Sequence, residues 1–116
     1  MPPDRDQAVI LDILTAGKLI LDFRKGLDQA GFLEDRKTQS AVIHQLLIIG
    51  EASKRLSPAF KSAHPGVPWD DIARMRDKMI HHYEGVNRHE VWNAVARDVP
   101  ALLAYLEPLA PPADFC

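Results

Sequence analysis

The chain has 116 residues, a formal net charge of −2 and 26% charged residues. A second hydrophobic core would leave each half of so short a chain too small, so one domain over residues 1–116 is expected. The slightly negative charge argues against a protein that coats nucleic acid by bulk positive charge. Six basic residues could still form a local basic patch: Lys54, Arg55, Arg74, Arg76, Lys78 and Arg88.

The cysteine content and the length of the apolar runs indicate the cellular compartment in which the protein is expected. Cys116 is the single cysteine, so the chain can form neither an internal disulfide nor a cysteine zinc site, and a reducing cytoplasm is expected. Residues 1–6 lack the pattern of a secretion signal. The longest apolar runs, such as residues 46–49, are far too short to span a bilayer, so no membrane association is expected.

Apolar residues recur at helical spacing along the sequence, and no clear run alternates with the period of a strand. This predicts an all-α fold. The first helix is expected to begin near Asp4 and to stop at Gly31. Its apolar stripe comprises Ile10, Ile13, Leu14, Gly17, Ile20, Leu21 and Leu27.

The second helix is predicted from about Asp35 to Leu56, and its apolar surface is wider than one buried side requires. Two neighbouring faces make up this surface: Val42, Leu46, Ile49 and Leu56 on one, and Ile43, Leu47 and Gly50 on the other. Either the helix packs on its own core and also on another chain, or it is the central helix of a single bundle. Gly50 would let a neighbouring helix come close.

The remaining chain reads as a loop and two further helices. Pro58, Pro65 and Gly66 indicate a loop up to Val67. Proline and two acidic residues at positions 68–71 open a third helix, whose core-facing residues are Ile72, Met75 and Met79 and whose end or bend is expected at Gly85.

Asn87 followed by Glu90 resembles a capping box and starts the fourth helix. Its apolar stripe comprises Val91, Val95, Val99, Leu102 and Leu106. Pro100 should kink this helix or divide it, and residues 108–116 are expected to fray. Together these elements predict an up-and-down bundle of four to five helices.

Residues 76–83 read Arg-Asp-Lys-Met-Ile-His-His-Tyr and are the most chemically specific part of the sequence. On an ideal helix Arg76 and Tyr83 point nearly the same way, whereas His81 lies roughly 140° from Arg76 around the axis. A straight helix therefore does not bring Arg76 and His81 to one phosphate. Either the helix deforms towards Gly85, or the residues meet across a dimer.

These residue types suit RNA cleavage without a metal. Histidine can activate the ribose 2′-hydroxyl or protonate the leaving oxygen, because it titrates near neutral pH. A guanidinium stabilises the negative charge that gathers on the phosphoryl oxygens. An arginine and a histidine at this spacing are a weak signal alone, because a surface arginine and a solvated or helix-capping histidine are the more common explanation.

The surroundings add to the motif. Residues 76–83 match the R-x4-H-x-Y signature, residues 49–52 read Ile-Gly-Glu-Ala, and residues 68–72 match the pattern Pro-Trp-x-x-Ile. Val91-Trp92 and Val99-Pro100 also fit. Over nearly its whole length the chain resembles the HEPN-domain ribonuclease toxins of the HepT type.

The resemblance implies an all-helical homodimer whose two motifs meet in a cleft and cleave RNA without a metal or other cofactor. It implies that Arg76 and His81 are catalytic. It also implies a cognate nucleotidyltransferase antitoxin of the MntA type, which transfers AMP to Tyr83 and would so place a bulky phosphate beside Arg76. Asp77 departs from the asparagine that commonly follows the arginine, and its carboxylate could weaken the pull of Arg76 on phosphate or orient it.

Several other interpretations remain open. A metal site at His81, His82 and His89 is disfavoured because adjacent histidines on a helix diverge by about 100°. Glu51 could reach the cleft or pair with Lys54 or Arg55 on its own helix. Trp69 and Trp92 could stack on bases or anchor the core. The whole chain could instead be a non-catalytic module that presents substrate to a nucleotidyltransferase, or a purely structural dimerisation bundle.

Overall fold

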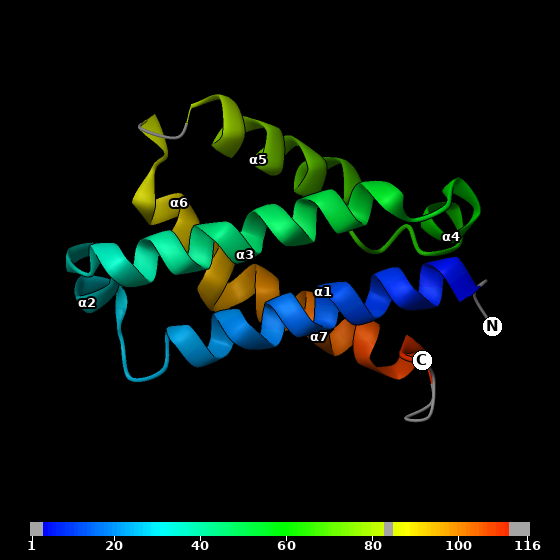
Figure 1. Cartoon of the computed structure of the whole chain (residues 1–116), viewed down its shortest axis with the longest axis horizontal. Helices are drawn as coiled ribbons and strands as arrows, with labels where there is room; N and C mark the ends of the chain where they lie inside the picture. Colours follow the sequence, from blue (N-terminus) through cyan, green and yellow to red (C-terminus); the bar gives the residue numbers. More distant parts are fainter. Residues whose placement is uncertain (1–3, 83–84, 112–116) are drawn as a thin grey trace.

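The computed structural model describes residues 4–82 and 85–111, and this part of the chain is helical with no strand (Figure 1). The predicted all-α class is therefore confirmed. Its main helices are α1 (Asp4–Phe23), α3 (Arg36–Arg55), α5 (Trp69–His81), α6 (Arg88–Asn93) and α7 (Val99–Leu106). Two short helices, α2 (Gln29–Glu34) and α4 (Pro58–Ala63), lie in the connections.

Helix α3 is the centre of the bundle. It packs along α1 on one side and along α5 on the other, while α7 packs on α1 (Figure 1). The core between these helices is made of fully buried residues, including Ile10, Ile13, Ile20, Val42, Ile43, Val91, Val95 and Leu106. The wide apolar surface of α3 is thus covered within one chain, as the single-bundle interpretation proposed, and does not by itself require a second chain.

The prediction of one helix up to Gly31 is wrong. Helix α1 ends at Phe23, and Gly26 adopts a positive φ of 80°, a conformation that glycine enters without steric cost. Asp28 then caps the separate helix α2, because its Oδ1 accepts a hydrogen bond from the Gly31 amide at 2.8 Å. Leu27 consequently lies outside the stripe of α1, whose other predicted members are buried or half-buried.

The predicted second helix is confirmed, but the loop after it contains a further helix. Asp35 caps α3 by accepting from the Thr38 amide at 3.0 Å, and Leu56 is its C-cap. Ser57 then caps α4, with Pro58 at its start, where the missing amide hydrogen costs nothing. The serine–proline pair therefore begins a helix directly after α3 ends, where the sequence predicts a loop up to Val67.

The second half of the chain follows the prediction with shifted ends. Helix α5 stops at His81, four residues before Gly85, because the backbone leaves helical geometry at His82 (φ −132°, ψ 44°). The Asn87 side chain caps α6 by accepting from the amides of His89 and Glu90 at 2.9 and 3.3 Å.

The predicted division near Pro100 is confirmed. A π-helical segment, Ala94–Asp98, separates α6 from α7, and Pro100 lies in the first turn of α7. Glu107–Leu109 form a 3₁₀ helix that contacts α1, so residues 108 and 109, which were expected to fray, are helical. Residues 112–116 lie outside the described part of the chain.

A buried carboxylate joins α1 to the start of α4. Asp6 is fully buried and accepts hydrogen bonds from the Ser57 amide at 2.9 Å and the Ser57 hydroxyl at 2.7 Å. We expect Asp6→Ala to lower the free energy of unfolding by about 1–3 kcal/mol, because it leaves a backbone donor without its acceptor. Urea denaturation followed by circular dichroism measures this loss.

The matched control is Asp12→Ala on the same helix. Asp12 pairs with Arg55 at 3.1 Å while both side chains are largely exposed. Such a pair contributes at most about 1 kcal/mol. If both variants lose the same free energy of unfolding, the buried hydrogen bonds of Asp6 contribute no more to stability than an exposed ion pair does.

Candidate active site

Arg76 lies at a point where α5 crosses close to α3. A Cβ atom added at Gly50 would overlap Cβ and Cγ of Arg76, so the glycine permits the approach of the two helices. Gly50 is itself buried at this crossing. The predicted close approach at Gly50 is confirmed, and the neighbouring helix belongs to the same chain.

The guanidinium of Arg76 joins a chain of four charges across the two helices. Its Nη2 donates to Oε2 of Glu51 at 2.8 Å, and its Nη1 donates to Oδ1 of Asp77 at 2.9 Å. Lys54 Nζ donates to the same oxygen of Asp77 at 2.6 Å. Glu51 therefore pairs across to α5, rather than with Lys54 or Arg55 along its own helix.

The two cations affect the ionisation of Asp77. The hydrogen bond from Lys54 first, and that from Arg76 second, lower the pKa of the Asp77 carboxyl below its ordinary value. Because the folded-state pKa is depressed, the stabilisation is present above the ordinary carboxyl pKa and is lost as pH falls through the folded value.

Lys54→Gln is expected to raise the pKa of Asp77 back towards the ordinary aspartate value, since it removes the larger of the two causes. An NMR titration of the Asp77 side-chain carboxyl measures this. Lys18→Gln, which removes a lysine paired with Glu107 at 3.4 Å, serves as the control and should leave the Asp77 titration unchanged. An unchanged Asp77 titration in Lys54→Gln would contradict the structure.

His81 does not join this network. It is the last residue of α5, it is exposed, and its side chain makes no hydrogen bond or ion pair with another described residue. Helix α5 is continuous from Trp69 to His81, so the imidazole points roughly 140° away from Arg76. Tyr83, the expected modification site, lies outside the described residues.

The six basic residues do not form an unpaired basic patch. Five of them pair with carboxylates, as Lys54 and Arg76 do, which compensates their charge locally. Arg88 instead donates to the side chain of Gln39 and to a backbone carbonyl. The remaining pairs are Arg55 with Asp12, Arg74 with Asp71, and Lys78 with Glu90.

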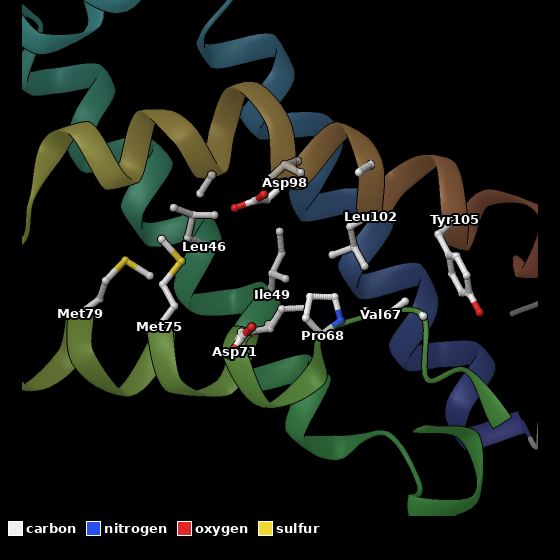
Figure 2. A pocket seen from close by; sticks show the side chains of 15 residues that line it. Leu46, Ile49, Val67, Pro68, Asp71, Met75, Met79, Asp98, Leu102 and Tyr105 are labelled. Atoms are coloured by element: carbon white, nitrogen blue, oxygen red, sulfur yellow. The ribbon is translucent and has the colours of Figure 1, made fainter. Parts of the chain in front are cut away.

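An apolar cleft of about 480 Å³ lies between α5 and α7 (Figure 2). Figure 2 shows Met75 and Met79 of α5 and Leu102 of α7 among the side chains that line it. Met79 is buried, whereas Ile72 and Met75 are only partly buried, so their predicted core position holds only in part. Neither Arg76 nor His81 lines the cleft, which is therefore separate from the candidate active site.

The other candidate residues have structural places. Trp69 and Trp92 are both buried, and the ring of Trp92 lies 5.3 Å from that of Phe32, so the core-anchor interpretation is correct. Among the described residues, no group of three or more histidine, cysteine or acidic side chains is arranged to hold a metal. No helix in the described ranges is long and apolar enough to cross a membrane.

The sequence analysis grouped Lys54 with Arg76 in a possible basic patch, but it did not predict that both residues pair with Asp77. Lys54 is four residues after Gly50 and three after Glu51 on α3, so Lys54 neighbours both positions on the helix surface. Once Gly50 is identified as the crossing point, these two side chains are placed opposite Arg76 and Asp77. The positions of Glu51 and Lys54 relative to Gly50 were therefore the feature of the sequence that could have predicted these contacts.

The fold and the site define a class: a small all-α bundle that carries an arginine and a histidine five residues apart on one helix. A family model described as "Ribonuclease HepT-like" matches residues 13–109. The chain belongs to this HepT-like family, which makes it a ribonuclease by class.

Two relatives illustrate the similarity. The chain is 48% identical over 98 residues to "Probable ribonuclease HepT" of Thermococcus cleftensis, covering 84% of this chain and 89% of that protein. It is 46% identical over 100 residues to "Putative RNase MJ0127" of Methanocaldococcus jannaschii, covering 86% of this chain and 83% of that protein. No solved structure matches the chain at a significant level.

Proposed function

We propose that the chain is the toxin of a type VII-like toxin–antitoxin pair and acts in the cytoplasm as a metal-independent endoribonuclease. The proposal is supported by the arrangement of the motif in a chain of this family. The arginine of the motif is fixed by two carboxylates at a helix crossing, and the histidine of the motif is exposed on the same helix, in a member of the HepT-like ribonuclease family.

The two side chains have complementary roles in this reaction. His81 moves a proton, either from the ribose 2′-hydroxyl or to the leaving oxygen. Arg76 binds the phosphate and stabilises the negative charge of the transition state through its guanidinium. Arg76 and His81 are five residues apart on the continuous helix α5, which separates them by roughly 140° around its axis. This separation supports a site that takes one residue from each of two protomers.

The proposal is tested by incubating the purified protein with RNA in the presence of a chelator. Cleavage should occur with the wild type and be lost in Arg76→Ala. Arg74→Ala is the matched control, because Arg74 lies on the same helix and also pairs with an aspartate. If the wild type and Arg76→Ala are equally inert on every RNA offered, the enzyme proposal is refuted.

The shared site has its own test. Arg76→Ala and His81→Ala are mixed, allowed to exchange subunits, and assayed together. If each site takes its arginine and histidine from different protomers, random pairing restores about a quarter of the wild-type activity. If both residues act within one protomer, the mixture stays as inactive as either variant alone.

A second candidate function is a non-catalytic module that presents substrate to a nucleotidyltransferase. The pairing of Arg76 with both Glu51 and Asp77 favours it, because two carboxylates already offset the charge that would hold a phosphate. Growth arrest on expression, relieved by His81→Ala, separates the toxin from this module. A purely structural bundle predicts that both point variants behave like the wild type in cells.

We also propose that a cognate nucleotidyltransferase antitoxin neutralises the chain by transferring AMP from ATP to Tyr83: the phenol oxygen loses its proton and bonds to the α-phosphorus, and pyrophosphate leaves. The added phosphate would compete with RNA for Arg76 by charge and by volume. Intact mass after incubation with that enzyme and ATP should rise by one or more AMP units. A mass gain that persists in Tyr83→Phe would show that Tyr83 is not the site.

A further inference from the structure

Two cations from different helices meet at a single oxygen atom. Lys54 of α3 and Arg76 of α5 both donate to Oδ1 of Asp77, at 2.6 and 2.9 Å. The two helices that carry these donors come into close contact at Gly50. One negatively charged oxygen is therefore enough to engage both cations.

A phosphodiester oxygen has the charge and the hydrogen-bonding capacity to take the place of this carboxylate oxygen. Guanidinium and ammonium groups bind phosphate strongly, and the planar guanidinium can offer two parallel donors to it. The position is open to a ligand, because the side chains of Lys54 and Asp77 remain 35% and 47% exposed. Ion pairs with this exposure contribute little to stability, so a ligand can displace them at low cost.

We infer that Lys54 and Arg76 form a two-cation site for a phosphodiester group of RNA, and that Asp77 occupies this site in the chain without RNA. The inference rests on the proposed function and deepens it by adding Lys54 as a phosphate-binding residue. Asp77 acts as an internal competitor: RNA must displace its carboxylate, which also repels the incoming phosphate. An asparagine would keep an acceptor for both cations and remove that repulsion.

The experiment measures binding apart from cleavage. The probe is a fluorescein-labelled single-stranded oligoribonucleotide of mixed sequence with every 2′-hydroxyl methylated, which removes the nucleophile. Fluorescence anisotropy gives its Kd at several salt concentrations, with folding checked by circular dichroism. Asp77→Asn is expected to bind about three- to tenfold more tightly than the wild type, and Lys54→Gln more weakly by a similar factor.

Two further measurements connect the residues. In Lys54→Gln the slope of log Kd against log salt concentration should fall by about 0.7, the value for one lost phosphate contact on a single strand. The double variant Lys54→Gln/Asp77→Asn should gain less affinity over Lys54→Gln than Asp77→Asn gains over the wild type, because one of the two released cations is missing.

The matched controls change the same charges elsewhere. Asp71→Asn removes a carboxylate from the same helix that pairs with Arg74 at 3.0 Å, and Lys18→Gln removes a lysine of α1 that pairs with Glu107. Both should leave Kd within about twofold of the wild type. Tightening by Asp71→Asn equal to that by Asp77→Asn would reduce the effect to overall charge and overturn the inference.

The remaining outcomes separate this inference from the proposed function. Unchanged or weaker binding in Asp77→Asn, or no binding of the probe by any variant, overturns the inference even if unmodified RNA is cleaved. The expected pattern of Kd values with no cleavage of unmodified RNA would leave the two-cation site standing and refute the nuclease.

Discussion

His81→Ala is expected to lower the rate of RNA cleavage by about 10²- to 10⁴-fold, the contribution of a positioned general acid or base. The imidazole is exposed at the end of α5, so its removal should not disturb the core. The loss should therefore fall on the rate, with little change in the melting temperature. Initial rates on a fluorogenic RNA in chelator, together with thermal melts, measure both quantities.

The adjacent histidine supplies the control. His82 is also exposed, and it lies one residue further along, at the C-cap of α5, so its substitution makes the same chemical change at a neighbouring place. His82→Ala should retain most of the activity. Equal losses in the two variants would show that the end of α5, and not the His81 imidazole, matters for the reaction.

Gly50→Ala is expected to lower cleavage by about a hundredfold, because displacement of a catalytic group by about 1 Å can have that effect. The new methyl group would overlap Cβ and Cγ of Arg76, atoms too close to the backbone of α5 to move away alone. The free energy of unfolding should change less than this loss of activity suggests, because two effects of opposite sign offset each other. Overpacking costs about 1–3 kcal/mol, while alanine gains about 1 kcal/mol of helix propensity over glycine.

Gly17→Ala is the control for this prediction. A Cβ at residue 17 would also be crowded, but by the end of the flexible Leu103 side chain on α7. We expect its stability to change by a similar or smaller amount and its activity per folded molecule to remain that of the wild type. Loss of activity in Gly17→Ala equal to that in Gly50→Ala would mean that the crossing at Arg76 has no special role.

Much of the fold could be predicted because the apolar period and the caps point to the same helices. Asp35, Pro68 and Asn87 mark helix starts that the structure confirms, within one residue. The main errors fall around Gly26 and at the pair Ser57–Pro58, where one helix ends and a new, capped helix begins within a few residues. Periodicity alone does not distinguish a helix that continues from a helix that restarts after a tight turn.

The candidate site was only partly predictable for a different reason. The order of residues along α5 gives the spacing of Arg76 and His81, and the structure keeps it. The partners Glu51 and Lys54 come from another helix, and their contact with α5 depends on where the two helices cross. The sequence predicts that a helix comes close at Gly50, but it does not say which helix this is or which residues then face each other across the contact.

The cleft beside α5 has a consequence for the mobility of the motif. Helix α5 packs along α3 on one flank, and its Met75 and Met79 line an opening towards α7 on the other. A helix supported on one flank opens locally at a lower free energy than one enclosed on both. Backbone amides of α5 should therefore exchange with deuterium sooner than those of α1 and α3, so the segment that carries the proposed chemistry would be the first of the long helices to detach.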